Sequence, residues 1–456
     1  MRLVRFSGLL FLLSLYSNFV QAQLPEAEKK VVFEPELSFR SFWMNTSYTN
    51  EAFRGDFALG LTSLVGGKLI VSKKWEFQTG YRVFANALSS DFWVPDPVTG
   101  QANRYESGLF NLLDPQDRLF GRLELFSLAF SQPKFGFKIG KMGIQTDWVN
   151  AQDGRLSPTV VEGVHAWVAP ATNWKLSGWA INRINVRGSK DWLSVGETIG
   201  LFPQGRSPFG KPAAYLGNTA SPWLGILELE GKMKGGRSLR FSNTYAANVF
   251  ATYWATYEKS SKKTMGTWTS GIQAGMQHGL GEGGNVDPLK QYKNPSDLNF
   301  AVSAKLNWKK GPWETQLSAT QVGGKGRWLS PREWGKDAWY TFVPRERNEG
   351  FETVTAAVGY VAYRFEEAGI QAYTYAGIHI LPDPKDAAAN KYNFPSYRQH
   401  NLGLKFIPKK AKNLDFHLIL VVKEPLTTQK LSTVQQYNKV DLLHFNGLIN
   451  WKLAKD

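Results

Sequence analysis

The chain has 456 residues, of which 43% are hydrophobic and 14% aromatic, with 43 glycines and no cysteine. So many aromatic residues exclude a disordered chain, and the lack of cysteine excludes a disulfide scaffold, a thiolate metal site and a cysteine nucleophile. A mean hydropathy of −0.31 excludes a bundle of membrane-spanning helices, which needs repeated apolar stretches of about 20 residues. The net charge of +16 favours anionic partners.

Residues 1–22 have the pattern of a cleavable export signal. A basic start precedes an apolar stretch from Leu9 to Leu15, and small residues follow at Val20 to Ala22. The alternative is an N-terminal membrane anchor, but this apolar stretch is short for a helix that spans a bilayer. We therefore predict an exported protein. Because one sequence texture continues to the C-terminus without a linker, residues 23–456 are predicted to form a single domain.

Apolar and polar residues then alternate with a period of two, which indicates β-strands. In one of the clearest segments, Phe300 and Val302 share one face, and Asn299 and Ser303 share the other. In chain order, the predicted strands are Leu37 to Met44, Phe57 to Ile70, Trp75 to Val83, Arg122 to Phe130, Phe135 to Ile139, Val164 to Val168, Trp174 to Ile181, Trp223 to Glu230, Leu239 to Ala247, Trp268 to Met276, Leu298 to Trp308, Trp313 to Gln321, Val354 to Tyr363, Ile370 to Ile380, Leu402 to Phe406, Leu414 to Val422 and Leu443 to Leu453.

The connections between these segments alternate in length. Some are tight, as at Gly235-Gly236 and Lys309 to Pro312. The long ones are Leu88 to Asp117, Asp147 to Glu162, Asn185 to Ser221, Gly279 to Pro295, Gly323 to Gly350 and Leu381 to Ser396. Short turns at one end and long loops at the other are typical of an outer-membrane barrel. At about 48 residues per hairpin, the chain holds about nine hairpins, which predicts an all-β transmembrane antiparallel barrel of about 16 to 18 strands.

A soluble β-sandwich or solenoid would also alternate. Two observations favour the barrel. Tryptophans recur at segment ends, where aromatic girdles of membrane barrels lie; they are Trp75, Trp174, Trp223, Trp308, Trp313 and Trp451. The inner faces carry Asn, Gln, Ser, Thr, Lys and Arg, which the dry core of a sandwich could not satisfy.

No catalytic or metal-binding pattern stands out. The six histidines have no metal-ligand spacing, and the chain contains no HExxH or GxSxG sequence. Gly279 to Gly284 matches GxGxxG, but an irregular loop follows in place of a helix, so no phosphate site is expected there. We predict that the protein is not an enzyme and binds no cofactor or metal.

Two stretches resemble one known family. The first runs from Phe137 to Met142 and continues with D-G-R-L-S-P at Asp153 to Pro158. The second, Glu333 to Gly350, ends in T-F-V-P-R-E-R-N-E-G. Both resemble the OprD-type specific porins of Gram-negative outer membranes. This resemblance implies an 18-stranded barrel with extracellular loops folded inward, and basic side chains along one wall that guide small carboxylate-bearing solutes.

Candidate solute-contacting residues come from the wall and from the loops. Strand parity places these cations on inward faces: Arg40, Arg82, Arg122, Lys138, Arg240, Lys305, Lys405 and Lys423. The candidate constriction residues are Asp153, Arg155, Glu333, Asp337, Tyr340, Arg345 and Arg347. Cations spaced along a pore can pass an anion onward without holding it too tightly. The alternative for the wall is pairing with neighbours such as Glu76 or Glu124, and for the loops an ion-paired plug.

Arg345 and Arg347 are the leading candidates, because alternate residues of an extended loop share a side and could meet one carboxylate. We expect an outer-membrane channel for passive diffusion of small anionic solutes. The alternative is a non-conducting outer-membrane barrel that serves envelope assembly or binds surface polysaccharide; the candidate sugar platform is Trp328, Trp334, Trp339 and Tyr340. Expected partners are outer-membrane lipid, lipopolysaccharide and the barrel-assembly machinery, without nucleic acid and with a monomer as the working assumption.

Overall fold

The computed structural model describes residues 31–114, 116–152, 154–202 and 205–453. The predicted export signal, residues 1–22, and the candidate residue Asp153 lie outside the described residues.

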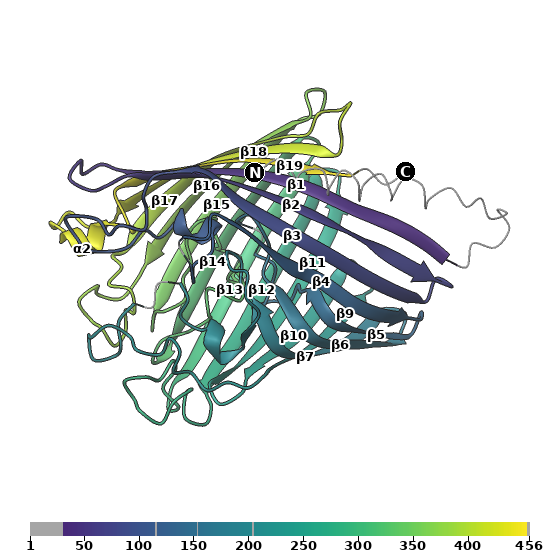
Figure 1. The fold of residues 1–456 in the computed structure, drawn as a ribbon, viewed down its shortest axis with the longest axis horizontal. Coiled ribbons are helices and arrows are strands. Elements are labelled where there is room, and N and C mark those ends of the chain that lie inside the picture. Colours follow the sequence, from purple (N-terminus) through teal and green to yellow (C-terminus); the bar gives the residue numbers. More distant parts are fainter. Residues whose placement is uncertain (1–30, 115, 153, 203–204, 454–456) are drawn as a thin grey trace, which may run out of the picture.

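The described residues form one sheet that closes into a barrel (Figure 1). Eighteen antiparallel strands build its wall, and the last strand pairs with the first to close it. The wall strands are β1 (Val31–Tyr48), β2 (Asp56–Val71), β3 (Trp75–Ser89), β4 (Leu119–Ser131), β5 (Phe135–Gly143), β6 (Val160–Ala171), β7 (Trp174–Asn185), β9 (Leu224–Met233), β10 (Arg237–Ala246), β11 (Phe250–Lys263), β12 (Gly266–Gly279), β13 (Leu298–Lys310), β14 (Trp313–Lys325), β15 (Val354–Phe365), β16 (Ile370–Ile380), β17 (Tyr397–Phe406), β18 (Leu414–Pro425) and β19 (Leu442–Lys452). One further short strand, β8 (Leu193–Ser194), pairs with the end of β7. The predicted all-β barrel of about 18 strands is confirmed.

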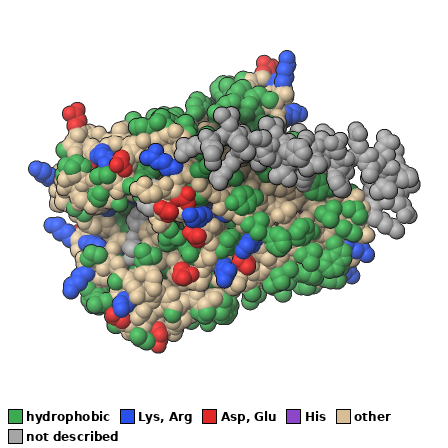
Figure 2. All heavy atoms as spheres, viewed as in Figure 1, with side chains coloured by type: hydrophobic (Ala, Val, Ile, Leu, Met, Phe, Trp, Pro, Cys, Tyr) green, Lys and Arg blue, Asp and Glu red, His purple; other side chains and the backbone are tan. Residues whose placement is uncertain are grey.

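The period-two pattern sets the two faces of the wall, because successive side chains of a strand point to opposite faces. In β13, Phe300 is 52% exposed and Val302 49% exposed, whereas Asn299 and Ser303 are fully buried. Hydrophobic side chains cover much of the strand surface in Figure 2. Within the described part of the chain, no helix has the length and apolar character needed to cross a membrane.

Short turns and long loops alternate along the barrel, as the sequence predicts. The turn between β13 and β14 contains Gly311 with a φ of 53°, a conformation that glycine adopts without strain. The long loops are 90–118 with the 3-10 helix η1 (Ser107–Leu109), 144–159, 186–223 with η2 (Gly196–Thr198), 280–297, 326–353, 381–396, and 426–441 with the short helix α2 (Thr433–Gln436). Because the strands are antiparallel and these loops alternate with the turns, the loops gather at one end of the barrel (Figure 1).

Several of these loops fold into the barrel and pack inside it. Trp148 from loop 144–159 meets Trp328 and Trp339 from loop 326–353, and all three contact Trp254 on the inner face of β11. The ring centroids lie 4.7 to 6.1 Å apart. Burying a large apolar side chain contributes about 1.5 to 3 kcal/mol, so this cluster holds both loops against the wall. Loops folded inward are therefore part of the fold.

Candidate functional site

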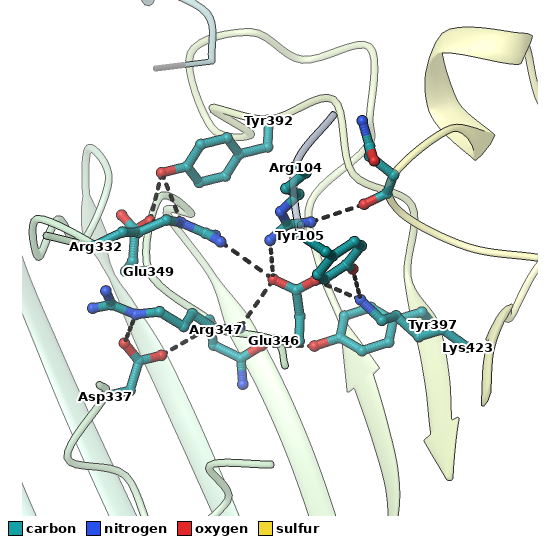
Figure 3. A network of polar contacts seen from close by, with 12 residues as sticks. Arg104, Tyr105, Arg332, Asp337, Glu346, Arg347, Glu349, Tyr392, Tyr397 and Lys423 are labelled. Atoms are coloured by element: carbon teal, nitrogen blue, oxygen red, sulfur yellow. Dashed lines mark hydrogen bonds and ion pairs between the residues drawn. The ribbon is translucent and has the colours of Figure 1, made fainter. Parts of the chain in front are cut away.

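Loop 326–353 carries a buried carboxylate, Glu346, that joins several segments of the barrel (Figure 3). Arg104 of loop 90–118 donates to it at 2.8 Å and Lys423 of β18 at 2.7 Å, while Arg332 lies 3.4 Å away. Burial would raise the pKa of the Glu346 carboxyl, but the charges of the three cations outweigh burial and hold its pKa well below its usual value. Glu346 therefore stays ionised and ties these segments together.

Two further ion pairs support the same loop. The Nε atom of Arg347 donates to Asp337 at 2.7 Å, and the backbone N–H of Asn348 donates to the second oxygen of that carboxylate at 2.7 Å. Arg332 pairs with the buried Glu349 at 2.5 Å. Removing one partner of a buried ion pair costs about 3 to 5 kcal/mol, because it leaves the other charge uncompensated. These contacts determine the path of the loop across the barrel.

The inward loops and the wall enclose a cavity of about 420 Å³ beside this network. Eight cations and one carboxylate, Glu346, are among its described lining residues. The cations are Arg104, Arg155, Arg187, Arg332, Lys336, Arg345, Arg347 and Lys405. A concave site lined by one sign of charge concentrates counter-ions, because its low-dielectric walls focus the field. The cavity is therefore electropositive.

Three of these arginines form no ion pair in the described part of the chain: Arg155, Arg187 and Arg345. Arg155 and Arg345 each donate from Nη1 to the carbonyl oxygen of Gly154, at 2.7 and 3.1 Å. Arg187 lies over the ring of Phe202, with its guanidinium carbon 4.7 Å from the ring centroid. Burial lowers the pKa of Arg155 to about 10, and burial together with the Arg155 charge lowers the pKa of Arg345 to about 9. Both remain cations at neutral pH.

The backbone turns sharply at Arg345. Its φ of 81° lies in the left-handed region, which non-glycine residues rarely adopt. The expected extended path, with Arg345 and Arg347 on one side, is therefore wrong. Arg345 reaches Gly154 and Arg347 reaches Asp337, although both still border the cavity. The two guanidinium groups have different partners and do not form one clamp.

The other predicted loop residues act as loop-positioning contacts and are not among the residues that line the cavity. Glu333 accepts hydrogen bonds from the backbone N–H groups of Gly200 and Phe202, at 3.1 and 2.8 Å, and so joins loop 326–353 to loop 186–223. Asp337 is engaged by Arg347, as described. Tyr340 donates to Glu258 of β11 at 2.8 Å.

Most of the predicted wall cations face the interior next to a carboxylate. Arg82 and Arg122 both bond to Glu124 at 2.7 Å. The remaining pairs are Lys138 with Glu76, Arg240 with Asp147, Lys305 with Glu258, and Lys423 with Glu346. Arg40 donates to Asn450 at 2.5 Å and to the carbonyl oxygen of Arg155 at 2.8 Å. Lys405 lines the cavity and makes no ion pair among the described residues, so the alternative interpretation, local pairing, describes most of the wall.

Sequence reasoning missed several cavity residues, above all Arg187, Arg104 and Lys336. Lys336 stands inside the second family-like stretch, which could have pointed to it. Arg104 and Arg187 are isolated arginines of long loops with no neighbouring pattern, so no signal in the sequence distinguishes them.

The structure does not support the interpretation of these tryptophans as a platform for sugar binding. Trp328, Trp334 and Trp339 are all buried in the packed interior and present no open ring face. Among the described residues, no group of three or more histidine, aspartate or glutamate side chains could hold a metal ion.

The class that this fold and cavity define is an 18-stranded barrel whose loops fold into the lumen. No family model matches the chain, and no curated protein matches its sequence. Solved structures of OprD/Occ family porins do share its fold, as the two family-like stretches led us to expect.

OccK9 (OpdG) of Pseudomonas aeruginosa superimposes with a TM-score of 0.69 at 11% identity, covering 92% of this chain and 98% of that chain. OpdK of the same organism, solved with vanillate, gives 0.70 at 12% identity over the same shares. OccAB2 of Acinetobacter baumannii gives 0.68 at 13% identity, again over 92% and 98%. At these identities the likeness is one of fold.

Proposed function

We propose that the protein is an outer-membrane channel for passive diffusion of small anionic solutes, especially those that carry a carboxylate. One observation carries this proposal: the cavity formed by the inward loops has eight cations and one carboxylate among its described lining residues. The barrel fold shared with OprD/Occ porins supports the channel function. Vanillate is bound in the OpdK structure, and a carboxylate solute is our proposal for this chain.

The cations of the cavity differ in whether a carboxylate of the protein pairs with them, and this difference supports selectivity. Arg104, Arg332 and Arg347 are committed to carboxylates of the protein and hold the loops that narrow the lumen. Arg155 and Arg345 donate to a neutral carbonyl and form no ion pair among the described residues, so their charge is available to a solute. Attraction between such charges in a wet pore is about 1 kcal/mol or less per pair, which is enough to concentrate an anion and weak enough to release it.

The setting of this channel is part of the proposal. The exposed apolar strand face would contact outer-membrane lipid and lipopolysaccharide, and insertion would need the barrel-assembly machinery after export by the N-terminal signal. The chain would act as a monomer and without a cofactor. The buried tryptophans give the polysaccharide-binding alternative no support, and we do not propose it.

Reversal potentials in planar bilayers test the proposal. With a KCl gradient across the bilayer, purified protein should conduct, and the sign of the reversal potential should show a preference for chloride. The preference should weaken at high salt, because the Debye length falls from about 8 Å at physiological ionic strength to about 3 Å at 1 M. A protein that inserts but does not conduct, or that prefers potassium, would contradict the proposal.

A further inference from the structure

A cluster of three cations, none of them paired with a carboxylate among the described residues, borders the cavity. Arg155 and Arg187 are only 7% and 9% exposed, and Arg345 is half-buried. The Nε–H group of each has no hydrogen-bond acceptor among the described residues. Buried charges are ordinarily paired. We call Arg155, Arg187 and Arg345 the arginine triad.

The three members of the triad come from loops 144–159, 186–223 and 326–353, and the fold brings them together. Because Arg155 and Arg345 share the carbonyl of Gly154, their Nη1 atoms lie within about 6 Å of each other. Arg187 borders the same cavity. Burial and the charges of Arg155, Arg347 and Arg345 lower the pKa of Arg187 well below its usual value. The like charges are thus close enough to repel one another.

The carboxylate of the cavity lining does not relieve this repulsion. Glu346 is held by Arg104, Lys423 and Arg332. Arg187 lies against the ring of Phe202, which orients the guanidinium without neutralising it. Glu106 attracts Arg155 and Glu333 attracts Arg187, but neither carboxylate forms an ion pair with the triad among the described residues. The direct contacts of the triad are a neutral carbonyl and aromatic rings, so an anion from solution would gain from all three members.

On the basis of the proposed function as an anion channel, we infer that the arginine triad is a fixed binding site for compact dianions, namely dicarboxylates or phosphate. The triad binds these dianions more tightly than monoanions of similar size. A guanidinium presents parallel N–H groups that match carboxylate or phosphate oxygens two at a time. A monocarboxylate can engage one such fork fully. A dianion has enough charge and enough oxygen atoms to engage two or three guanidinium groups. It therefore neutralises more of the positive charge of the triad.

Calorimetric titration of the detergent-solubilised protein tests this inference without requiring conduction. At low salt and about pH 8, where succinate and phosphate are dianions, succinate should bind about tenfold more tightly than butyrate, which has the same number of carbons and one carboxylate. Inorganic phosphate forms a second arm. Tighter binding of succinate than phosphate would assign the site to dicarboxylates, and the reverse order would assign it to phosphate; either supports a dianion site.

Two variants make the test specific. Arg187→Gln removes one triad charge and should weaken binding of the preferred dianion about tenfold while changing butyrate binding about twofold. Arg398→Gln removes an equal charge from an exposed pair with Glu424 on β17 and β18 and should leave both affinities unchanged. Heat-modifiable migration on gels confirms that each variant is a folded barrel, and Arg187→Lys, which keeps the charge but loses the fork, should bind with intermediate affinity.

The outcomes separate the two proposals. Equal affinity for succinate and butyrate, with phosphate no tighter, or equal effects of Arg187→Gln and Arg398→Gln, would overturn the dianion site even if the barrel conducts anions. Tight dianion binding by a barrel that does not conduct would support the site and refute the channel. If both hold, added dianion should reduce the chloride conductance of the wild type at lower concentration than butyrate, and Arg187→Gln should lessen this block.

Discussion

Arg155 and Arg345 donate hydrogen bonds to one carbonyl oxygen, that of Gly154, at 2.7 and 3.1 Å. The two arginines belong to different loops, and Arg345 lies 191 residues from Gly154 in the chain. A neutral oxygen can accept from both guanidinium groups but cancels neither charge. This shared acceptor therefore keeps two cations side by side while their positive potential remains available to a solute.

Gly154→Ala should displace Arg345 without unfolding the barrel. A Cβ atom at this position would lie 3.0 Å from Arg345 Nη1, so the end of that flexible side chain has to move. We expect the anion-to-cation permeability ratio, obtained from reversal potentials in a KCl gradient, to fall about twofold as one cation leaves its place. Gly143→Ala is the control, because nothing lies within 4 Å of its added Cβ. Equal ratios in the two variants would contradict this arrangement.

Arg345→Gln and Arg347→Gln should have different effects, because Arg347 is paired with a carboxylate and Arg345 is not paired with one among the described residues. Arg345→Gln should slow carboxylate uptake several-fold and leave a neutral sugar of equal size nearly unchanged, since a charge interaction of about 1 kcal/mol is lost. Arg347→Gln leaves Asp337 without its cation, so the loop should loosen and the uptake of both solutes should change. Liposome swelling measures the uptake of both solutes by each variant. If Arg345→Gln changed the uptake of the carboxylate and of the sugar equally, Arg345 would hold the loop in place and would not determine selectivity.

The two faces of β13 should differ in their tolerance of charge. Val302 lies near the middle of the strand on the exposed face, so Val302→Arg should cost about 2 to 4 kcal/mol of folding free energy in a lipid bilayer. Asn307 points inward and donates to Glu314 at 3.3 Å, so Asn307→Arg gains an ion partner and should be tolerated. Urea titration of the proteins folded in lipid vesicles gives both values. Similar losses in the two variants would show that the faces are assigned wrongly.

Glu106 should couple stability to pH. Its buried carboxyl accepts hydrogen bonds from Thr46 at 2.6 Å and from Asn103 at 2.7 Å, and burial raises its pKa to about 7. An acid whose pKa is raised by folding favours the folded state when protonated, so stability is lost as pH rises from about 4.3, its unfolded pKa, through about 7.

Glu106→Gln copies the protonated carboxyl and should be the more stable protein above about pH 7, by up to about 4 kcal/mol, with the difference vanishing near about pH 4. Unfolding followed by circular dichroism at several pH values measures this difference. Glu282→Gln, at an exposed loop position, should show no such trend. A stabilising effect of Glu106→Gln that increased toward low pH would contradict the assignment.

The wall of the barrel could be predicted because its outward and inward faces carry opposite chemistry at successive residues of one strand. Phe300 and Asn299 show this requirement clearly. Strand β11 was not predicted from the sequence, because its two faces do not differ in this way. Tyr253 faces outward, but Trp254 faces inward and packs against loop tryptophans, so aromatic residues occupy both faces and the alternation is hidden. A period-two pattern reports a strand only where its two faces differ.

The sequence by itself determined the barrel, its loop-bearing end and an excess of positive charge, because alternation and composition are local properties of the chain. Only the tertiary structure decided which cations are neutralised, because an ion pair depends on atoms that come within about 4 Å across the folded loops. Arg104 pairs with Glu346, which lies 242 residues away in the chain. Arg347, a leading candidate from the sequence, pairs with Asp337. No sequence signal distinguished Arg187, which lies beside the cavity and pairs with no carboxylate in the part of the chain that the structure describes, because the loops around it close that way.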